Sequence, residues 1–195
     1  MRDAISRFDA FYTEFKKSEL WKNMLTVRDA CADHREENVA HHTRLATDWY
    51  LRNLAPNRSD QMIMLTGIAC LFHDAGKTLV TPHSTAERLT HEFFSLELWF
   101  NYSYTARATI RDHLRLSQHD LSRISFIIFH HELSNLEGEG ACVLKKSLPA
   151  FMDEISEVAW LDTVRSDQHG HYSDTHSKQL DRLYAGLAHW ISIPR

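Results

Sequence analysis

His73 and Asp74 lie next to each other where a continuous apolar stretch of the chain, residues 62–72, comes to an end. The apolar residues of this stretch recur at helical spacing, which predicts a buried helix over residues 60–73. An imidazole and a carboxylate at the end of a buried helix are costly to bury unless a partner compensates them. A divalent transition metal is the partner that this combination of ligand types suits. For a single pair, a helix end that reaches solvent is the commoner explanation.

The same residue types recur on apolar faces or at the ends of other predicted helices. The candidates are His42, His73, Asp74, His91, His130, His131 and Asp162. His42 lies on the apolar stripe of a helix predicted over residues 36–54, and Asp162 continues an apolar stripe, although carboxylates are rare at core positions. One buried histidine is more often an ordinary core residue than a ligand. Several of them in a helical bundle favour a mononuclear or dinuclear metal centre.

Apolar periodicity predicts the helices that must position these residues. An amphipathic helix with a break near Ser18 spans residues 3–25. Ser117 and Asp120 form an acidic variant of the capping box at the start of a helix that ends in His130 and His131, and His131 continues its stripe of isoleucines. The remaining expectations are helices over residues 91–102, 105–116 and 178–194, a helix beginning at Ser147, and loops over residues 78–90, 134–146 and 166–177.

The composition is that of one ordinary globular domain. A chain of 195 residues, 43% of them hydrophobic and 25% charged, is long enough for one sizeable core. Six glycines and four prolines are too few for the many turns of an all-β fold, so we predict a single all-α domain over residues 1–195. The fourteen histidines are a compositional indication of metal binding.

Charge and cysteine content argue against several functional classes. The formal net charge of −4 argues against an extended nucleic-acid surface, although it leaves room for a local basic site that takes a phosphorylated ligand. The three cysteines are widely spaced and form no CxxC pair, which fits a reducing compartment and argues against a thiolate zinc finger. We find no signal-peptide pattern and no apolar run of membrane-spanning length, and therefore expect a soluble, cytoplasmic protein.

The order of the candidate ligands resembles the HD-domain superfamily of metal-dependent phosphohydrolases over residues 36–167. The resemblance begins with His42, followed by His73 and Asp74 and then by the distal Asp162. Residues 37–43, ENVAHHT, resemble the first-histidine motif of HD-type 5′-nucleotidases, which selects the second of the two histidines. The segments HDAGK, LTHE, LRLS and FHHE are more similar to the HD domain attached to bacterial tRNA nucleotidyltransferases. That domain is a phosphohydrolase of 2′,3′-cyclic phosphates and 2′-nucleotides.

This resemblance implies an all-α HD domain whose core holds one or two divalent ions, drawn from Mn, Co, Ni, Zn, Fe and Mg. The residues expected to hold the first ion are His42, His73, Asp74 and Asp162. The residues expected to hold a second are His91, His130 and His131, with Asp74 bridging the two ions. Whether His130 or His131 is the ligand stays open at this point, as does the number of ions.

Asp74 and Lys77 are the predicted catalytic residues of a phosphohydrolase. A bound metal lowers the pKa of water and polarises phosphoryl oxygens, and Lys77 would stabilise charge on the phosphoryl group or protonate the leaving group. A solvated lysine at a helix end is an equal alternative for Lys77. Arg35 is predicted to bind substrate phosphate with Lys77, although an exposed arginine is the commoner case. Asp167 either orients a ligand histidine or is an ordinary loop carboxylate.

The leading prediction is hydrolysis of a nucleotide or RNA-end phosphoester. Some proteins of the HD fold use a similar ligand set to hold two irons and act as oxygenases, and a non-catalytic nucleotide-binding module is a further alternative. The full pattern also resembles that of cyclic-dinucleotide phosphodiesterases and CRISPR-associated HD nucleases. The Gly-Tyr-Pro signature of the cyclic-dinucleotide enzymes is missing here, because Leu133, Ser134 and Asn135 follow Glu132.

Overall fold

The structure is a computed structural model that describes residues 2–28, 37–80, 91–131 and 152–170. Within these ranges the secondary structure is helical and contains no strand, so the all-α prediction is confirmed for them. Four of the sequence predictions lie outside the described residues: most of the loop at 78–90, the loop at 134–146, the helix start at Ser147 and the C-terminal helix at 178–194.

The N-terminal part of the chain forms two helices, α1 (Arg2–Phe15) and α2 (Glu19–Thr26). The side chain of Ser18 accepts a hydrogen bond from the first turn of α2 at 3.2 Å, so the predicted break at this residue is confirmed. The ring of Phe15 lies 5.1 Å from that of Phe72, centroid to centroid. The N-terminal helix therefore packs into the same core as the helix that ends at the candidate site.

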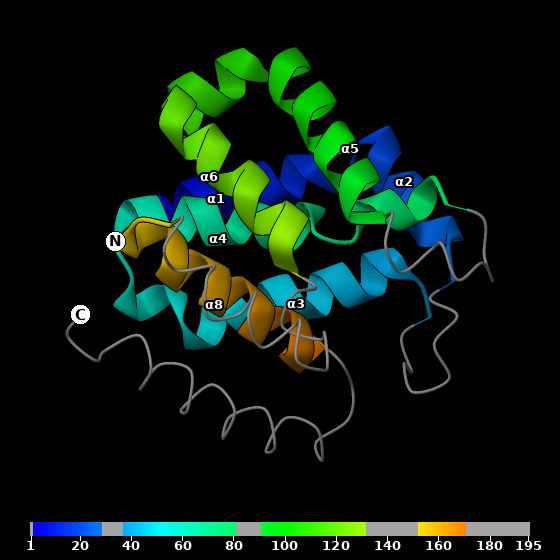
Figure 1. Cartoon of the computed structure of the whole chain (residues 1–195), viewed down its shortest axis with the longest axis horizontal. Helices are drawn as coiled ribbons and strands as arrows, with labels where there is room; N and C mark the ends of the chain where they lie inside the picture. The colour runs from blue at the N-terminus through cyan, green and yellow to red at the C-terminus, as the bar shows by residue number, and fades with distance from the viewer. Residues whose placement is uncertain (1, 29–36, 81–90, 132–151, 171–195) are drawn as a thin grey trace.

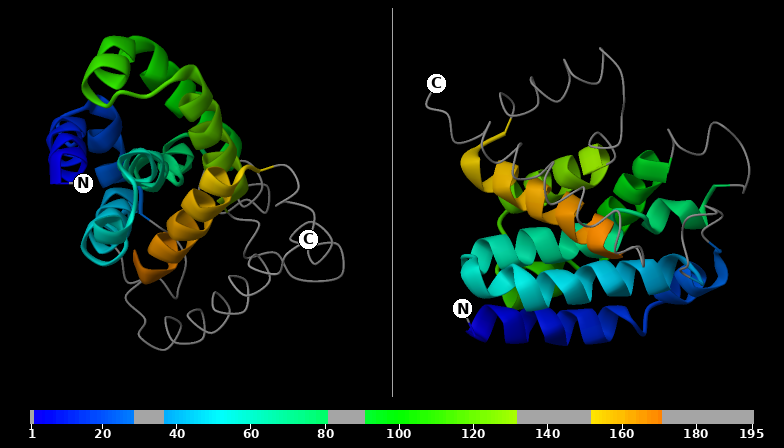
Figure 2. Two further views of the ribbon diagram at one scale, coloured as in Figure 1. Left: turned by 90° about the vertical axis from the view of Figure 1, so that its left-hand side faces the viewer. Right: turned by 90° about the horizontal axis from the view of Figure 1, so that it is seen from below.

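The helix α4 (Asp60–Phe72) forms the centre of the molecule and is buried continuously over residues 63–72. It packs against α1, α3 (Val39–Asn53), α6 (Gln118–His130) and α8 (Glu154–Gly170). In the left-hand view of Figure 2, α4 is seen end-on in the middle of these helices. A helix that is apolar on all sides needs such a surround, because every face of it must be removed from water.

The helix α8 lies along α3 and runs in the opposite direction, as the colours of Figure 1 show. The side chain of Asp153 accepts a hydrogen bond from the backbone N–H of Ser156 at 2.8 Å and so caps α8. Residues 152 and 153 are not helical, so the predicted continuous helix from Ser147 to Asp162 is wrong at this point.

At its other end α8 continues to Gly170, which makes the predicted loop wrong for residues 166–170. The polar composition of this stretch suggested exposure to solvent. Ser166 and Asp167 are in fact buried, and the hydroxyl of Ser166 donates to the backbone carbonyl of Asp162 at 2.6 Å. The polar residues here make internal contacts, and sequence composition alone does not distinguish these from contacts with water.

The other side of the core is covered by α5 (His91–Thr105), a π-helical turn η4 (Thr109–His113) and α6. The predicted capping box is confirmed, because Ser117 and Asp120 exchange side-chain and backbone hydrogen bonds at the start of α6. The ends of α5 and α6 that contain His91 and His130 meet beside the end of α4 (Figure 1). These two helices therefore bring a second set of histidines to the place where α4 ends.

In the described part of the chain, two short 3₁₀ turns follow longer helices: η1 (Ala55–Asn57), which contains Pro56, follows α3, and η2 (Ala75–Thr78) follows α4. The turn η2 lies directly against α5. A Cβ atom on Gly76 would lie 1.9 Å from the backbone oxygen of His91 and 2.4 Å from the backbone nitrogen of Ser95. Only glycine allows the two backbones to approach this closely.

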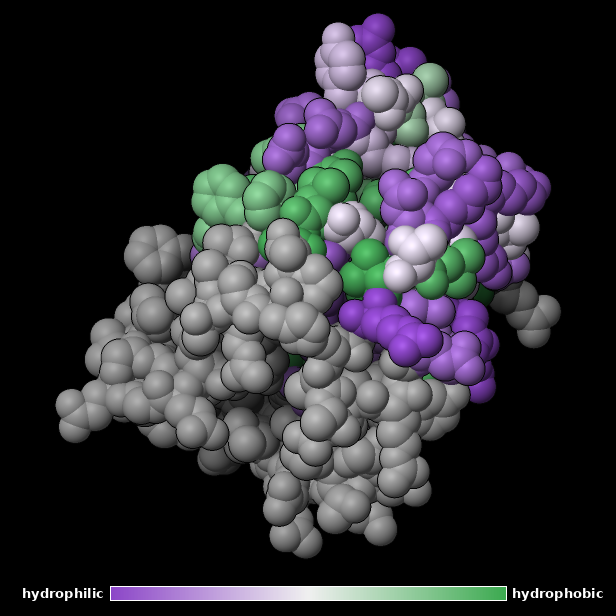
Figure 3. Space-filling model, turned by 90° about the vertical axis from the view of Figure 1, so that its right-hand side faces the viewer, coloured by the Kyte–Doolittle hydropathy of each residue, from purple (hydrophilic) through white to green (hydrophobic). Residues whose placement is uncertain are grey.

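Several large apolar side chains of the described residues are exposed on the surface. Figure 3 shows one face, on which hydrophobic surface adjoins hydrophilic surface. Among the described residues, the exposed large hydrophobic ones are Leu25, Leu79, Phe93, Phe100, Tyr104 and Phe129. Phe93 and Phe129 pack against each other with ring centroids 5.7 Å apart, and exposed apolar residues of this kind are ordinary in globular proteins. Among the described helices, none is both long and apolar enough to span a bilayer.

Replacing Gly76 with alanine is expected to destabilise the protein by about 1–3 kcal/mol, the usual range for overpacking, because the new methyl group meets backbone that cannot rotate away. Urea unfolding of Gly76→Ala measures this. Leu79→Ala is the control, since Leu79 is 52% exposed and follows the same turn, and we expect it to change stability by no more than about 0.5 kcal/mol. Equal stabilities for the two variants would contradict the close approach of η2 to α5.

Candidate metal centre

His73 and Asp74 are adjacent in sequence. Both side chains point toward one centre because the helical conformation ends at Asp74, directly before η2. Consecutive residues of an undisturbed helix lie about 100° apart around its axis. Asp74 leaves the helical conformation, with φ −105° and ψ 1°. The N–H of Lys77 then bonds to the carbonyl of Asp74 at 3.1 Å, three residues back, which tightens the turn. The break thus turns the Asp74 carboxylate toward the ring of His73.

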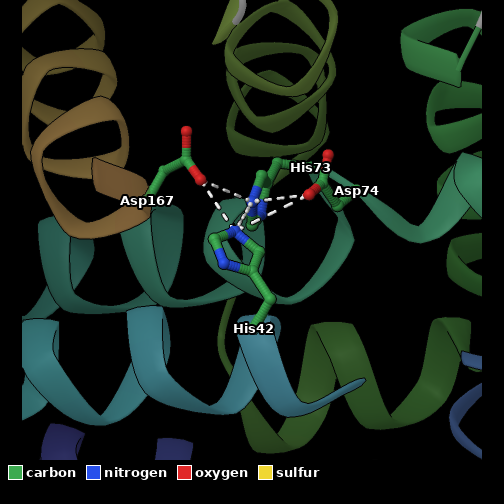
Figure 4. A group of neighbouring side chains, drawn as sticks. All are labelled: His42, His73, Asp74 and Asp167. Carbon is green, nitrogen blue, oxygen red and sulfur yellow. Dashed lines mark hydrogen bonds and ion pairs between the residues drawn. The ribbon is translucent and has the colours of Figure 1, made fainter. Parts of the chain in front are cut away.

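Four side chains from three elements meet at this point, as Figure 4 shows. They are His42 from α3, His73 and Asp74 from the end of α4, and Asp167 from α8. The Nε2 atoms of His42 and His73 are 3.2 Å apart, and Oδ1 of Asp167 lies 2.8 Å from the first and 3.3 Å from the second. Oδ2 of Asp74 is 3.6 Å from each of these nitrogens. All four residues are buried.

The hydrogen bond made by Nδ1 of His73 determines which nitrogen of this ring can bind a metal. Its Nδ1 lies 2.9 Å from the backbone carbonyl of Cys70 and can only donate there, because a carbonyl oxygen has no proton to give. The lone pair of the neutral ring is therefore on Nε2, the atom that points toward His42 and Asp167. A backbone carbonyl behind a histidine is the usual support of a metal ligand.

The spacing of these four ligand atoms fits one divalent ion. Ligands bound at about 2.0–2.2 Å lie about 2.8–3.6 Å from their neighbours at the angles of octahedral or tetrahedral coordination. The close separations in the group span the same range, from 2.8 to 3.6 Å. Two imidazole nitrogens and two carboxylate oxygens also form a donor set that transition metals prefer. The residues present therefore fit a metal ion in both distance and chemistry.

Asp74 belongs to a second group as well, together with His91 from α5 and His131, the residue that follows α6. Its other oxygen, Oδ1, lies 3.3 Å from Nε2 of His91 and 3.7 Å from Nε2 of His131. His131 donates from Nδ1 to the backbone carbonyl of Ile128 at 2.7 Å, so its Nε2 also offers a lone pair. Oδ2 of Asp74 thus lies in the first ligand group, and Oδ1 of the same carboxylate lies in the second.

At Asp74 and Asp167, burial and the neighbouring side chains shift the pKa of the carboxyl group in opposite directions. Burial raises the pKa of Asp74, but Lys77 and His73 together with the other histidines outweigh it and hold the pKa well below its usual range. Burial likewise raises the pKa of Asp167, and its contacts with His42 and His73 lower it further than burial raises it. Both carboxylates are therefore ionised, which is the form that binds a cation.

The predicted ligand Asp162 is not in either group, and this prediction is corrected by the structure. Its carboxylate is held by Arg58, with Nε to Oδ2 at 2.6 Å and Nη2 to Oδ1 at 2.8 Å. Asp167 occupies the place expected for Asp162. Five residues of helix separate the two, which moves a side chain about 7.5 Å along the axis and turns it to a different face.

The two histidines at the end of α6 have different surroundings. His131 is buried in the second group, whereas His130 is half-buried, stacks on Phe126 at 4.0 Å between ring centroids and joins neither group. The dipeptide alone does not decide between them, although the isoleucine stripe that runs into His131 favours it. Arg35, the predicted phosphate ligand, lies outside the described residues.

Lys77 lies beside the site and is partly buried. Its Nζ atom is 2.7 Å from Oδ2 of Asp74, and its side chain is 22% exposed. This contact with a buried carboxylate argues against the alternative of a freely solvated lysine at a helix end. The ammonium group therefore places one positive charge next to the carboxylate that the two ligand groups share.

The sequence predicts Asp167 as a residue that orients a ligand histidine or as a loop carboxylate, and the structure places it in the first ligand group. The two differ because the sequence predicts a loop over residues 166–177, and a residue in a loop has no defined helix face. A helix continued through residue 170 would have put Asp167 on the side of α3. Gly170, at the end of α8, lies close to α3, since a Cβ atom there would lie 3.1 Å from Cε1 of His42.

Comparisons of the chain with models of protein families, with curated proteins and with solved structures found no match. The resemblance to the HD-domain superfamily therefore stays a prediction from the sequence motifs. The geometry independently supports a group of His and Asp residues that could bind metal.

Replacing Asp167 with asparagine is expected to weaken metal binding by at least about 100-fold, the upper range for losing even a residue that supports a ligand. Asp162→Asn is the matched control on the same helix. It should retain the metal and lose about 1–3 kcal/mol of stability, because the guanidinium of Arg58 loses its charged partner. Elemental analysis of metal per chain and urea unfolding measure the two effects. Metal lost from Asp162→Asn and kept by Asp167→Asn would contradict the assignment.

Proposed function

We propose that this protein is a metal-dependent phosphohydrolase that acts on a nucleotide or an RNA-end phosphoester. The observation on which the proposal depends most is the sharing of Asp74 between two ligand groups through its two oxygens. A carboxylate placed in this way suits a pair of neighbouring ions, and paired ions are common in enzymes that cleave phosphoesters. The order of the motifs in the sequence, which resembles HD phosphohydrolases, supports the same function.

The residues present define which side chains would hold the ions. The first would be held by His42, His73, Asp74 and Asp167, and the second by Asp74, His91 and His131. When bound, divalent ions lower the pKa of water and polarise phosphoryl oxygens. The protein's own contribution is to hold neutral imidazoles and ionised carboxylates in place. The carbonyls of Cys70 and Ile128 do so by fixing the rings of His73 and His131.

Lys77 supports an anionic substrate. Its ammonium group lies beside the shared carboxylate and is partly open to solvent, so it could approach a bound phosphoryl group with a modest side-chain movement. A positive charge fixed next to developing negative charge stabilises a transition state more than it would in water, because the low-dielectric surroundings screen it less. We assign Lys77 to the stabilisation of phosphoryl charge or to protonation of the leaving oxygen.

The reaction is tested with purified protein assayed for phosphate or nucleotide release on 2′,3′-cyclic nucleotides, nucleoside mono- and triphosphates and a bis-phosphodiester, with Mn, Co, Ni or Mg. We expect metal-dependent turnover of at least one of these. Asp74→Asn should lose both the metal and the turnover, because both ligand groups lose the charge of the carboxylate they share. Bound iron with oxygen consumption and no phosphate release would instead identify an oxygenase. A wild-type protein that binds no metal would overturn the proposal.

Replacing Lys77 with methionine separates its role from that of the ligands. Lys77→Met is expected to retain the metal and to lose about 10²- to 10³-fold in kcat, the usual cost of removing one group that stabilises transition-state charge. Lys22→Met is the control, because Lys22 is 60% exposed and pairs with Glu19 on α2. Steady-state kinetics on the best substrate of the panel measure the effect. Turnover at the wild-type rate in Lys77→Met would contradict the role given to this lysine.

A further inference from the structure

Ser95 lies on α5, one turn beyond His91, and is completely buried. Its hydroxyl donates a hydrogen bond to the backbone carbonyl of His73 at 2.7 Å and accepts one from the backbone N–H of Gly76 at 2.8 Å. Both groups belong to the break at the end of α4, where the first set of candidate ligands begins. A single side chain of α5 thus contacts the backbone on both sides of Asp74.

Those two backbone groups need a partner because the helix breaks there. In a continuous helix the carbonyl of His73 would accept from the N–H of Lys77, four residues on. Here the N–H of Lys77 bonds to the carbonyl of Asp74 instead. Buried backbone groups without a partner cost about as much as a lost hydrogen bond. The hydroxyl of Ser95 satisfies one acceptor and one donor at the place where the conformation of Asp74 departs from the helix.

The same contact joins the two ligand groups. Asp74 is on one side of it and His91 on the other, and Nε2 of His91 lies 3.3 Å from Oδ1 of Asp74. The missing side chain of Gly76 lets the backbone of α5 approach η2, but it only removes an obstacle. The hydrogen bonds of Ser95 link α5 to η2. Because hydrogen bonds are directional, they set the distance between these two segments, whereas apolar packing alone would let one segment slide along the other.

We propose that Ser95 is a positioning residue that sets the separation between the two ligand groups, and that binding of a second metal ion at His91 and His131 depends on it. This inference rests on the proposed dinuclear centre. Both hydrogen bonds of the Ser95 hydroxyl described above go to backbone groups. Ser95 acts through the backbone of His73 and Gly76 and through the placement of α5.

Mn(II) is the probe, because its electron paramagnetic resonance spectrum distinguishes an isolated ion from a magnetically coupled pair. Wild-type protein is expected to bind two Mn(II) ions and to give the coupled spectrum. Ser95→Ala should keep the first ion, bind the second about 10- to 100-fold more weakly and give the spectrum of an isolated ion. Isothermal titration calorimetry measures the two affinities without any assay of activity.

Ser103→Ala is the matched control for removing a buried hydroxyl from α5. Ser103 donates to the carbonyl of Phe100 in its own helix at 3.0 Å and is 8% exposed. It should bind two coupled ions as the wild type does. A general loosening of α5 would change both serine variants alike, whereas a positioning role changes Ser95→Ala alone.

The outcomes separate this inference from the proposed function. Two coupled ions with wild-type affinities in Ser95→Ala would overturn the role of Ser95 and leave the centre standing. Fewer than two ions in the wild type would overturn the dinuclear centre together with this inference, and phosphate release from the same samples then tests the proposed function separately. Should Ser95→Ala fail to fold, Ser95→Cys keeps the side-chain shape with a weaker donor and acceptor. Wild-type Mn(II) binding in that variant would also overturn the inference.

Discussion

The arrangement of the described helices depends on keeping the charge of Asp74 and Asp167 inside the bundle. Each carboxylate is buried, and removing an ion from water costs several kcal/mol unless its surroundings compensate it. Histidine nitrogens from α3, α4 and α5 and the ammonium of Lys77 supply part of this compensation. A divalent cation would supply the rest, since Lys77 contributes one positive charge against two negative ones. The ligand groups thus bear on the stability of the core as well as forming a candidate site for chemistry.

Much of this arrangement could be predicted from residue types and spacing. The break at Ser18, the capping box of Ser117 and Asp120, and the burial of His42 follow from local rules that depend on a few neighbouring residues. These rules work because a cap or an apolar stripe is determined within one or two turns of helix. The contribution of His131 was also partly predictable, since it continues the apolar stripe of α6.

The exchange of Asp162 for Asp167 shows where such rules stop. Periodicity identified Asp162 as an inward-pointing carboxylate, and the structure agrees that it is buried. Its partner, Arg58, lies in the connection after η1, more than a hundred residues away in the sequence, and no local pattern links the two. The candidate site needs a carboxylate next to His42, and the antiparallel packing of α8 on α3 decides which residue that is.

Asp162 and Asp167 therefore attach α8 to two different parts of the protein. The pair between Asp162 and Arg58 attaches α8 to the connection that precedes α4, and Asp167 meets His42 one and a half turns further along. Two polar attachments at different heights restrict sliding of α8 along its axis, which apolar packing alone would resist only weakly. Sliding by one residue would move the Asp167 carboxylate by about 1.5 Å, several times the tolerance of about 0.2 Å on a metal–ligand distance. The register of α8 is thus part of the candidate metal site, although Asp162 itself contacts none of its ligands.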